Sequence, residues 1–296
     1  MKLLEVTHAV RDSLRAASID NAALDAQLLA ASVLGIDRIS VLASPELKLS
    51  EKQTRDILSL AQRRQAHEPM AYILGHQEFY SLSFSITPDV LIPRPETELL
   101  VDLALSCLPQ KAHKTAPAKI LDLGTGSGCI AVAVSYHAKA SHETPFILAI
   151  DSCPRALALA EYNAAKNGVS GNIVFQNCNI LDDDLPTQLI NQSFDIIISN
   201  PPYIPKHEFP VLPTSVREFE PKAALFGGED GLNFYRALGI HSKTLLHPGG
   251  RIMLEVGKGQ STEVSSLLSA YGLADINVIK DLSGIERVVT ARKNIQ

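Results

Sequence analysis

The sequence predicts an α/β protein in which an all-helical module precedes a mostly parallel sheet covered by helices. Three observations predict this class. Apolar residues in roughly the first 70 positions recur at helical spacing. From Glu78 the period changes to the alternation of a β-strand. Apolar strand-like runs and helical segments then alternate over about 180 residues, the pattern of parallel strands joined by helices.

The helical module is predicted over residues 1–75. The apolar residues Leu3, Leu4, Val10 and Leu14 fit one helical face. Asp20 is placed to cap the start of a second helix and Gly35 to end it. Ser50 and Gln53 have the spacing of a capping box at the start of another helix. Residues 1–70 contain nine Lys and Arg against nine Asp and Glu, so the module is not a basic DNA-binding arm. We expect it to recognise a substrate rather than to catalyse.

A β-hairpin linker is predicted over residues 76–92, where Leu82, Phe84 and Ile86 alternate with polar residues. The domain predicted over residues 93–296 opens with a helix from Pro93 to Cys107, with prolines at its tolerant first turn. The expected strands lie at 119–124, 146–151, 172–176, 194–199, 251–257, 274–280 and 286–292, and helices start at 128 or lie at 154–168, 230–246 and 260–270.

The composition and charge of the sequence argue against several classes of function. The 296-residue chain is 46% hydrophobic and 20% charged, which is typical of globular proteins. A net charge of −5 argues against tight binding of a phosphate backbone, so no nucleic-acid partner is expected. Charged residues interrupt the N-terminal segment, which predicts a cytoplasmic protein without signal peptide or membrane association. Metal-ligand spacing is absent from the cysteines, so we expect free thiols and no metal at Cys107, Cys129, Cys153 and Cys178.

A glycine-rich loop, "GTGSG" at Gly124, Thr125, Gly126, Ser127 and Gly128, closes the first strand of the predicted sheet. The first two glycines permit a sharp turn close to a ligand, and the third lets a helix begin nearby. Ligands of open α/β sheets bind beyond the carboxyl ends of the strands, where this loop lies. Its GxGxG spacing differs from the dinucleotide and P-loop fingerprints. A turn without a ligand is the alternative.

Asp151 ends the next expected strand, "FILAID". An acid at this point accepts hydrogen bonds from both hydroxyls of a ribose in nucleoside-binding sheets. A carboxylate that only caps the following helix is the alternative. The glycine loop and the acid together indicate a nucleoside cofactor and do not require a pyrophosphate.

The strand "FDIIIS" stops on Asn200-Pro201-Pro202-Tyr203. The Asn200 side chain and the Pro201 backbone offer two carbonyl oxygens, which together hold both hydrogens of a planar NH2 group. Tyr203 adds a flat face for an amide or a base. An amide nitrogen is a weak nucleophile, and holding it in line with an electrophilic methyl group raises its reactivity through positioning. We therefore interpret this motif as a clamp for nitrogen methylation; a proline-rich strand stop is the alternative.

These motifs resemble those of the release-factor glutamine methyltransferases, the HemK/PrmC family of class I S-adenosylmethionine-dependent methyltransferases. The resemblance covers nearly the whole chain and includes "VLIPRPETE" (90–98), "DLGTGSG", "NPPYI" and "FEPKAALFGGEDGL" (219–232). It implies a seven-stranded methyltransferase domain behind the helical domain. It also implies transfer of a methyl group to the glutamine of the Gly-Gly-Gln motif in class 1 release factors, with S-adenosylhomocysteine as product.

The resemblance also implies residue roles. Gly124 through Gly128 hold the methionine end of the cofactor, and Asp151 binds its ribose. Asn179 and Ile180 stand near the adenine, where family members usually carry an acid beside a bulky residue, and Asn200 borders the cofactor. Asn200, Pro201, Pro202 and Tyr203 bind the substrate glutamine, and we expect Asn200, Pro201 and Tyr203 to be catalytic.

Two segments have open interpretations. Arg94, Glu96 and Glu98 of "RPETE" either border the cofactor crevice or only start a helix. The segment from Pro205 to Glu229 lacks a regular pattern, and we expect this long loop to contact the protein substrate. Alternative functions are a ribosomal-protein glutamine methyltransferase, an adenine N6-methyltransferase on DNA or RNA, or a cofactor-binding scaffold without catalysis.

Overall fold

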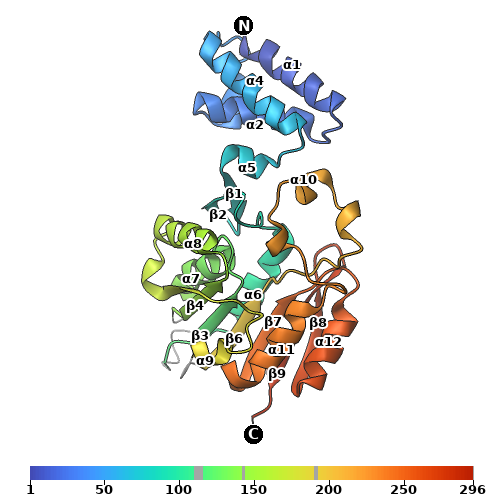
Figure 1. The fold of residues 1–296 in the computed structure, drawn as a ribbon. Coiled ribbons are helices and arrows are strands. Elements are labelled where there is room, and N and C mark those ends of the chain that lie inside the picture. Colours follow the sequence, from blue (N-terminus) through green and yellow to red (C-terminus); the bar gives the residue numbers. More distant parts are fainter. Residues whose placement is uncertain (110–115, 142–143, 190–192, 296) are drawn as a thin grey trace. The chain divides into compact units, whose positions relative to one another are not determined.

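The computed structural model describes residues 1–109, 116–141, 144–189 and 193–295, which form two compact units (Figure 1). One unit consists of Met1–His76 with Pro213–Phe219, and the other of Gln77–Leu212 with the residues from Glu220 onward. No helix in these ranges is long and apolar enough to cross a membrane. All four cysteines have free thiols. The domain limits at residues 75 and 92 stay predictions.

The helical unit is built around the apolar faces of its longer helices. Its helices are α1 (Leu3–Ala16), α2 (Ala22–Leu34), α3 (Arg38–Ala43), α4 (Glu51–Gln65) and α5 (Met70–Leu74), and α10 (Thr214–Arg217) belongs to the same unit. Gly35 ends α2 with a φ of 65°, as predicted, but the residue at its N-cap is Asn21 and not the expected Asp20. Leu4, expected on the apolar face of α1, is 41% exposed. The predicted capping box is also confirmed, because Ser50 N donates to Gln53 Oε1 (2.9 Å) and Gln53 N to Ser50 Oγ (3.2 Å).

The second unit opens with a hairpin of β1 (His76–Phe79) and β2 (Leu82–Ser85). The helix expected from Pro93 begins later, as a 3-10 turn, η1 (Pro95–Thr97), followed by α6 (Glu98–Cys107). Arg94 precedes a proline and is extended, with φ −98° and ψ 144°. A residue before proline is disfavoured in the helical region, which explains the later start.

A seven-stranded sheet follows, in the order β5-β4-β3-β6-β7-β9-β8 (Figure 1). The pairings from β5 through to β7 are parallel, whereas β9 pairs antiparallel with both β7 and β8. The strands are β3 (Lys119–Leu123), β4 (Phe146–Asp151), β5 (Ile173–Asn177), β6 (Phe194–Ser199), β7 (Leu246–Glu255), β8 (Leu273–Lys280) and β9 (Glu286–Lys293). The predicted mostly parallel, seven-stranded architecture is therefore confirmed.

Helices cover both faces of the sheet (Figure 1). One layer contains α6, α7 (Cys129–Ser141) and α8 (Pro154–Lys166), and the other contains α9 (Leu185–Gln188), α11 (Asn233–Leu245) and α12 (Ser261–Ala270). The remaining short turns are η2 (Ser170–Asn172), η3 (Phe209–Val211) and η4 (Lys222–Ala224). The segment expected to be irregular, 205–229, thus contains η3, α10 and η4.

The chain order reverses direction across the sheet between β3 and β6. From β3 the chain adds β4 and β5 on one side, and it then returns to place β6 on the other side of β3. Such a switch point opens a crevice beyond the carboxyl ends of the strands. The glycine loop follows β3 and the Asn-Pro-Pro-Tyr motif follows β6, so the sheet brings the two predicted motifs side by side.

Candidate active site

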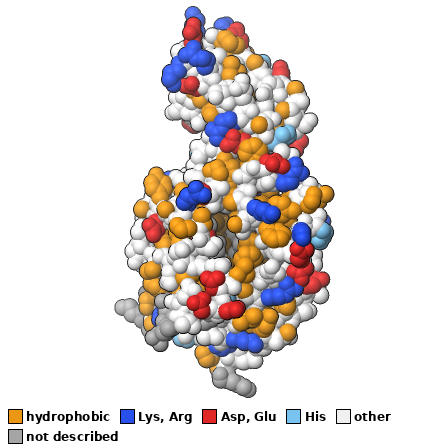
Figure 2. Space-filling model, viewed as in Figure 1, with side chains coloured by type: hydrophobic (Ala, Val, Ile, Leu, Met, Phe, Trp, Pro, Cys, Tyr) orange, Lys and Arg blue, Asp and Glu red, His pale blue; other side chains and the backbone are white. Residues whose placement is uncertain are grey.

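The glycine loop is held against β4 by its backbone. Gly124 N and Thr125 N both donate to Ile150 O, each at 2.9 Å. Gly124, Gly126 and Gly128 have φ values of 75°, 54° and 80°, in the left-handed region that favours glycine. Apart from Gly126 and its chain neighbours, no described residue has an atom within 4 Å of a Cβ built on Gly126, so the loop borders open space at this residue. Figure 2 shows this face of the unit hollowed beside α7 and α8.

Asp151 connects the glycine loop to the start of α8. Its Oδ2 accepts from Gly126 N and its Oδ1 from Cys153 N, both at 2.9 Å. Burial raises the pKa of this carboxyl group, and the backbone N–H groups oppose the shift. Each oxygen keeps a further acceptor site, so the carboxylate fits a pair of ribose hydroxyls. The capping contact of the alternative interpretation is also present, at Cys153.

Asp122 lies beneath this loop and is fully buried. Thr125 Oγ1 donates to Asp122 Oδ2 at 2.7 Å, while Oδ1 has no hydrogen-bond partner among the described residues. Burial raises the pKa of Asp122 to about 7. Asp122 was not among the predicted site residues, although it is the single carboxylate in the apolar run "KILDLG".

Asn179 and Ile180 follow β5. Ile180 is buried, and its Cδ1 atom would lie 3.5 Å from a Cβ built on Gly124, so it borders the glycine loop. The Asn179 amide is engaged within its own turn, because Nδ2 donates to Asp182 Oδ1 (2.8 Å) and Oδ1 accepts from Leu181 N (3.1 Å). Contacts of both residues with an adenine stay predictions.

The Asn-Pro-Pro-Tyr motif begins where β6 ends beside β3. Ser199 Oγ donates to Leu123 O at 2.6 Å, so Asn200 and Gly124 follow two strand ends that are bonded to each other. The residue after the motif, Ile204, donates through its backbone to Leu225 O and accepts from Gly227 N, each at 2.9 Å. The two prolines therefore lie between the strand end and this second anchor.

The glycines of "FGGEDG" allow that second anchor. A Cβ built on Gly227 would lie 2.8 Å from Tyr203 Cα, and one built on Gly231 would lie 2.4 Å from Tyr203 O. Real Cβ contacts are longer than these, so only glycine permits the approach. The segment 225–231 therefore supports the backbone of the motif, a role that the sequence analysis did not assign.

Tyr203 is held on a third side by the residues after β7. Gln260 Nε2 donates to Tyr203 O at 3.0 Å, and a Cβ built on Gly257 would lie 2.9 Å from the Tyr203 ring atom Cδ2. Burial raises the pKa of Tyr203 to about 12. The neutral phenol thus offers a flat, uncharged face at a fixed place.

The Asn200 side chain is the end of a buried chain of hydrogen bonds. Asn200 Nδ2 donates to Thr97 Oγ1 at 3.1 Å, and Thr97 Oγ1 donates to Glu255 Oε2 at 2.7 Å. Glu255 ends β7 and is only 3% exposed, and burial raises its pKa to about 7. Sequence reasoning missed both partners: Glu255 stood out as an acid in the apolar run "RIMLEVG", and Thr97 had no signal of its own.

The residue of the "RPETE" segment that bonds to Asn200 and Glu255 is therefore Thr97, and not one of the charged residues. Arg94 forms an ion pair with the buried Glu220, whose other oxygen accepts from Ile92 N at 3.3 Å. Glu98 starts α6, as the helix-start interpretation expects, and its Oε1 accepts from Tyr80 N at 2.8 Å. Glu96 lies in the first turn of η1.

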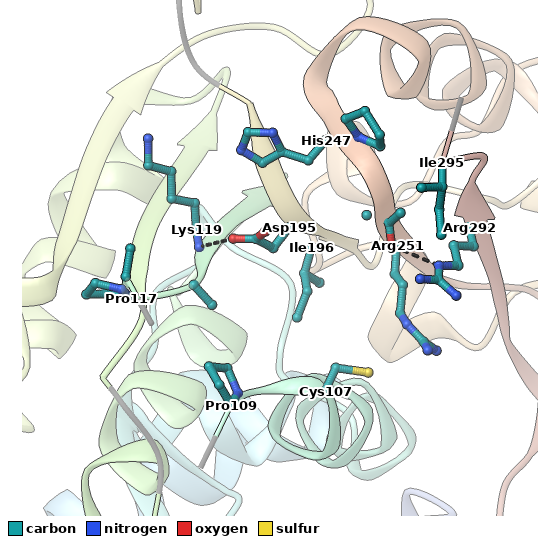
Figure 3. A pocket seen from close by; sticks show the side chains of 15 residues that line it. Cys107, Pro109, Pro117, Lys119, Asp195, Ile196, His247, Arg251, Arg292 and Ile295 are labelled. Carbon is teal, nitrogen blue, oxygen red and sulfur yellow. Dashed lines mark hydrogen bonds between the residues drawn. The ribbon is translucent and has the colours of Figure 1, made fainter. Parts of the chain in front are cut away.

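A cavity of about 560 Å³ lies at the opposite, amino edge of the sheet (Figure 3). Lys119 N donates to Asp195 Oδ2 at 2.8 Å there, and Arg292 Nε donates to Gly249 O at 3.0 Å. None of the residues predicted for the cofactor or substrate lines it. Its polar lining side chains include those of Cys107, Lys119, Asp195, His247, Arg251 and Arg292.

The seven-stranded sheet is that of a class I, Rossmann-like methyltransferase, a family that implies the use of S-adenosylmethionine. Residues 5–75 match the family described as PrmC N-terminal domain, and residues 114–272 match that described as methyltransferase domain. The chain is 39% identical over 274 residues to the release factor glutamine methyltransferase of Geobacter sulfurreducens, covering 93% of this chain and 90% of that protein. It belongs to the release factor glutamine methyltransferase family.

A second relative matches nearly the full length of the chain, and a solved structure matches its fold. The release factor glutamine methyltransferase of Caulobacter vibrioides is 36% identical over 294 residues, which is 99% of this chain and 97% of that one. The crystal structure of a methyltransferase from Pyrococcus furiosus matches with a TM-score of 0.51 at 18% identity, over 83% of this chain and 100% of that one. The latter is a likeness of fold alone.

Proposed function

We propose that the chain methylates the side-chain amide nitrogen of the glutamine in the Gly-Gly-Gln motif of class 1 peptide chain release factors. The observation that carries the proposal is the position of Asn200 and Pro201, which follow the strand neighbouring the glycine loop at the switch point of the sheet. Relatives that match nearly the full length of the chain are named release factor glutamine methyltransferase, which supports the proposal.

Asn200, Pro201 and Tyr203 would together hold the nitrogen of the substrate amide in place. With Asn200 Nδ2 occupied by Thr97, the Asn200 Oδ1 atom is the acceptor left for one hydrogen of the substrate NH2 group. The backbone oxygen of Pro201 is a second acceptor of fixed direction. Tyr203 would pack its ring against the planar amide. Positioning of this kind supplies the rate enhancement, and no general base is required before attack.

The residues beyond β3, β4 and β5 fit S-adenosylmethionine, which supplies an electrophilic methyl group when bound and leaves as S-adenosylhomocysteine. We assign the methionine end to the loop from Gly124 to Gly128 and the ribose to Asp151. Asn179, Ile180 and Asn200 are assigned to the remainder of the cofactor. No metal is needed for this chemistry.

The protein substrate would be recognised outside the clamp, by the helical module 1–75 and by the segment 205–229. Because 204–206 pair with 225–228, the test replaces only residues 208–218 with a Gly-Ser linker and leaves the anchor of the clamp intact. Unchanged methylation of a release factor by this variant would contradict the role of the segment.

The function is tested by transfer of label from S-adenosylmethionine to three acceptors in parallel. These are a class 1 release factor, the same factor with its Gly-Gly-Gln glutamine changed to alanine, and duplex DNA. Label only in the intact factor is the expected result. Label in DNA would replace the proposal with adenine methylation, and label in both factors would move the site away from the glutamine. A ribosomal-protein substrate mixture distinguishes the related glutamine methyltransferases.

A further inference from the structure

We propose that Thr97 and Glu255 are positioning residues that fix the orientation of the Asn200 amide, so that the site selects a side chain ending in NH2 over one ending in a carboxylate. The inference rests on the proposed function and adds a specificity device to it. It concerns two side chains that do not themselves reach the substrate in this assignment.

The three groups come from separate parts of the unit. Asn200 follows β6, Glu255 ends the neighbouring β7, and Thr97 precedes α6. In the parallel register Ser199 pairs with Leu254, which sets Asn200 opposite Glu255. Thr97 is 2% exposed and bridges them, with the two hydrogen bonds of 3.1 and 2.7 Å.

The direction of these two hydrogen bonds follows from which of the three side chains can donate. An ionised carboxylate accepts hydrogen bonds and donates none, so the single hydroxyl proton of Thr97 is directed at Glu255. The Thr97 oxygen then has only lone pairs for Asn200, and the amide must turn its NH2 group toward Thr97. The Asn200 oxygen consequently remains for the substrate. The alternative orientation would place two acceptors against each other inside the protein, at the cost of a buried unsatisfied group.

This orientation has a consequence for specificity. A glutamine side chain donates two hydrogens, which match the Asn200 and Pro201 oxygens. A glutamate side chain offers only acceptors and meets two carbonyl oxygens, which repel it. If the Asn200 amide were free to rotate, its NH2 group would be able to donate to that glutamate. Glutamine and glutamate differ little in shape, so the fixed orientation is the means by which the clamp separates them.

The test compares a release factor with its natural glutamine against the same factor carrying a Gln→Glu substitution in the Gly-Gly-Gln motif, used as a competitive inhibitor. The ratio of the inhibition constant of the glutamate factor to the KM of the glutamine factor measures discrimination. Assays are run at about pH 8.5, where a carboxyl group with a pKa near 7 is ionised. Each variant is checked for folding by thermal unfolding and for cofactor binding by calorimetry.

Three variants separate positioning from packing. Thr97→Val keeps the shape but removes the hydroxyl, so Asn200 loses the acceptor that orients it. Glu255→Met keeps the length but removes the acceptor, so the Thr97 proton becomes free to bind the Asn200 oxygen and turn the amide. Thr97→Ser keeps the hydroxyl and is the matched control.

We expect discrimination to fall about tenfold or more in Thr97→Val and in Glu255→Met, the size of one hydrogen bond to a charged group, with kcat lowered in both. Thr97→Ser is expected to keep the ratio of the parent. Folded Thr97→Val and Glu255→Met proteins that retain the parent ratio would overturn the inference, whatever their kcat. Failure of the parent to methylate the glutamine factor would instead overturn the proposed function.

Discussion

At the carboxyl edge of the sheet two acidic side chains are buried, whereas at the amino edge the side chains of Lys119, Asp195 and Arg251 are exposed. Asp122 and Glu255 are 0% and 3% exposed, and each binds one threonine hydroxyl. At the other edge, Lys119 and Arg251 are exposed although they line the cavity of about 560 Å³. These two exposed cations are thus held less firmly than the two buried acids.

Buried hydrogen-bonded groups mark a reactive site better than exposed charges do. A buried polar group is costly unless its partners are fixed, so a chain of buried hydrogen bonds holds one geometry. An exposed lysine or arginine is solvated and free to move, and its interactions contribute little. We therefore place the candidate active site at the switch point of the sheet rather than at this cavity. The following predictions contrast the two edges.

The largest effect is expected from Asn200→Ala at the carboxyl edge. The change removes one of the two acceptors for the substrate NH2 group, so we expect kcat for release-factor methylation to fall by about 100-fold or more. Label transfer at saturating cofactor measures it. Near-normal turnover would refute the clamp and leave the motif a strand stop.

A smaller but clear effect is expected from Gly227→Ala, which tests the support of the clamp rather than the clamp itself. The new Cβ would lie 2.8 Å from Tyr203 Cα. We expect a loss of about 1–3 kcal/mol in unfolding free energy and reduced methylation. Gly171→Ala is the matched control, because no atom lies within 4 Å of its Cβ position. Equal behaviour of the two variants in denaturant unfolding and in methylation would contradict the account of "FGGEDG".

The buried acid Asp122 is expected to make the free energy of unfolding depend on pH. Its pKa rises to about 7, mainly through burial, with the nearby Asp151 charge adding to the shift and the Thr125 hydrogen bond opposing it. The folded state therefore binds the proton more tightly than the unfolded state, so the stabilisation is complete below about pH 4 and is lost as the pH rises through about 7.

Asp122→Asn removes this titration. We expect the parent to lose more unfolding free energy than the variant between about pH 5 and pH 8, by on the order of 2–3 kcal/mol. Denaturant unfolding at both pH values measures the difference. Identical pH slopes would show that Asp122 is not the buried acid responsible.

The smallest effect is expected at the amino edge. Arg251→Ala removes an exposed cation from the cavity, and we expect methylation within about twofold of the parent and unfolding free energy within about 0.5 kcal/mol. The same label-transfer and denaturant assays apply. A loss of methylation as large as that of Asn200→Ala would abolish the distinction between the two edges.

Local patterns were sufficient to predict the sheet, its helices and both motifs. Strand alternation, the glycine spacing and the strand end at Asn200 each depend only on residues that are close together in the sequence. The sequence alone did not reveal Thr97 as a partner of Asn200, because the two are far apart in the chain. They meet only where α6, which follows Thr97, packs against β6 and β7. The support of Tyr203 by Gly227 was hidden for the same reason: its cause is a close approach between segments. The later start of α6, by contrast, follows from Pro95, and the sequence contained that signal.

The most direct test of the central claim is to find where the methyl group is placed. A class 1 release factor is incubated with the protein and S-adenosylmethionine, and its Gly-Gly-Gln peptide is analysed by tandem mass spectrometry. The account predicts one added methyl group on the side-chain amide nitrogen of that glutamine. A methyl group on another residue, or on a backbone or carboxylate atom of this peptide, would contradict it.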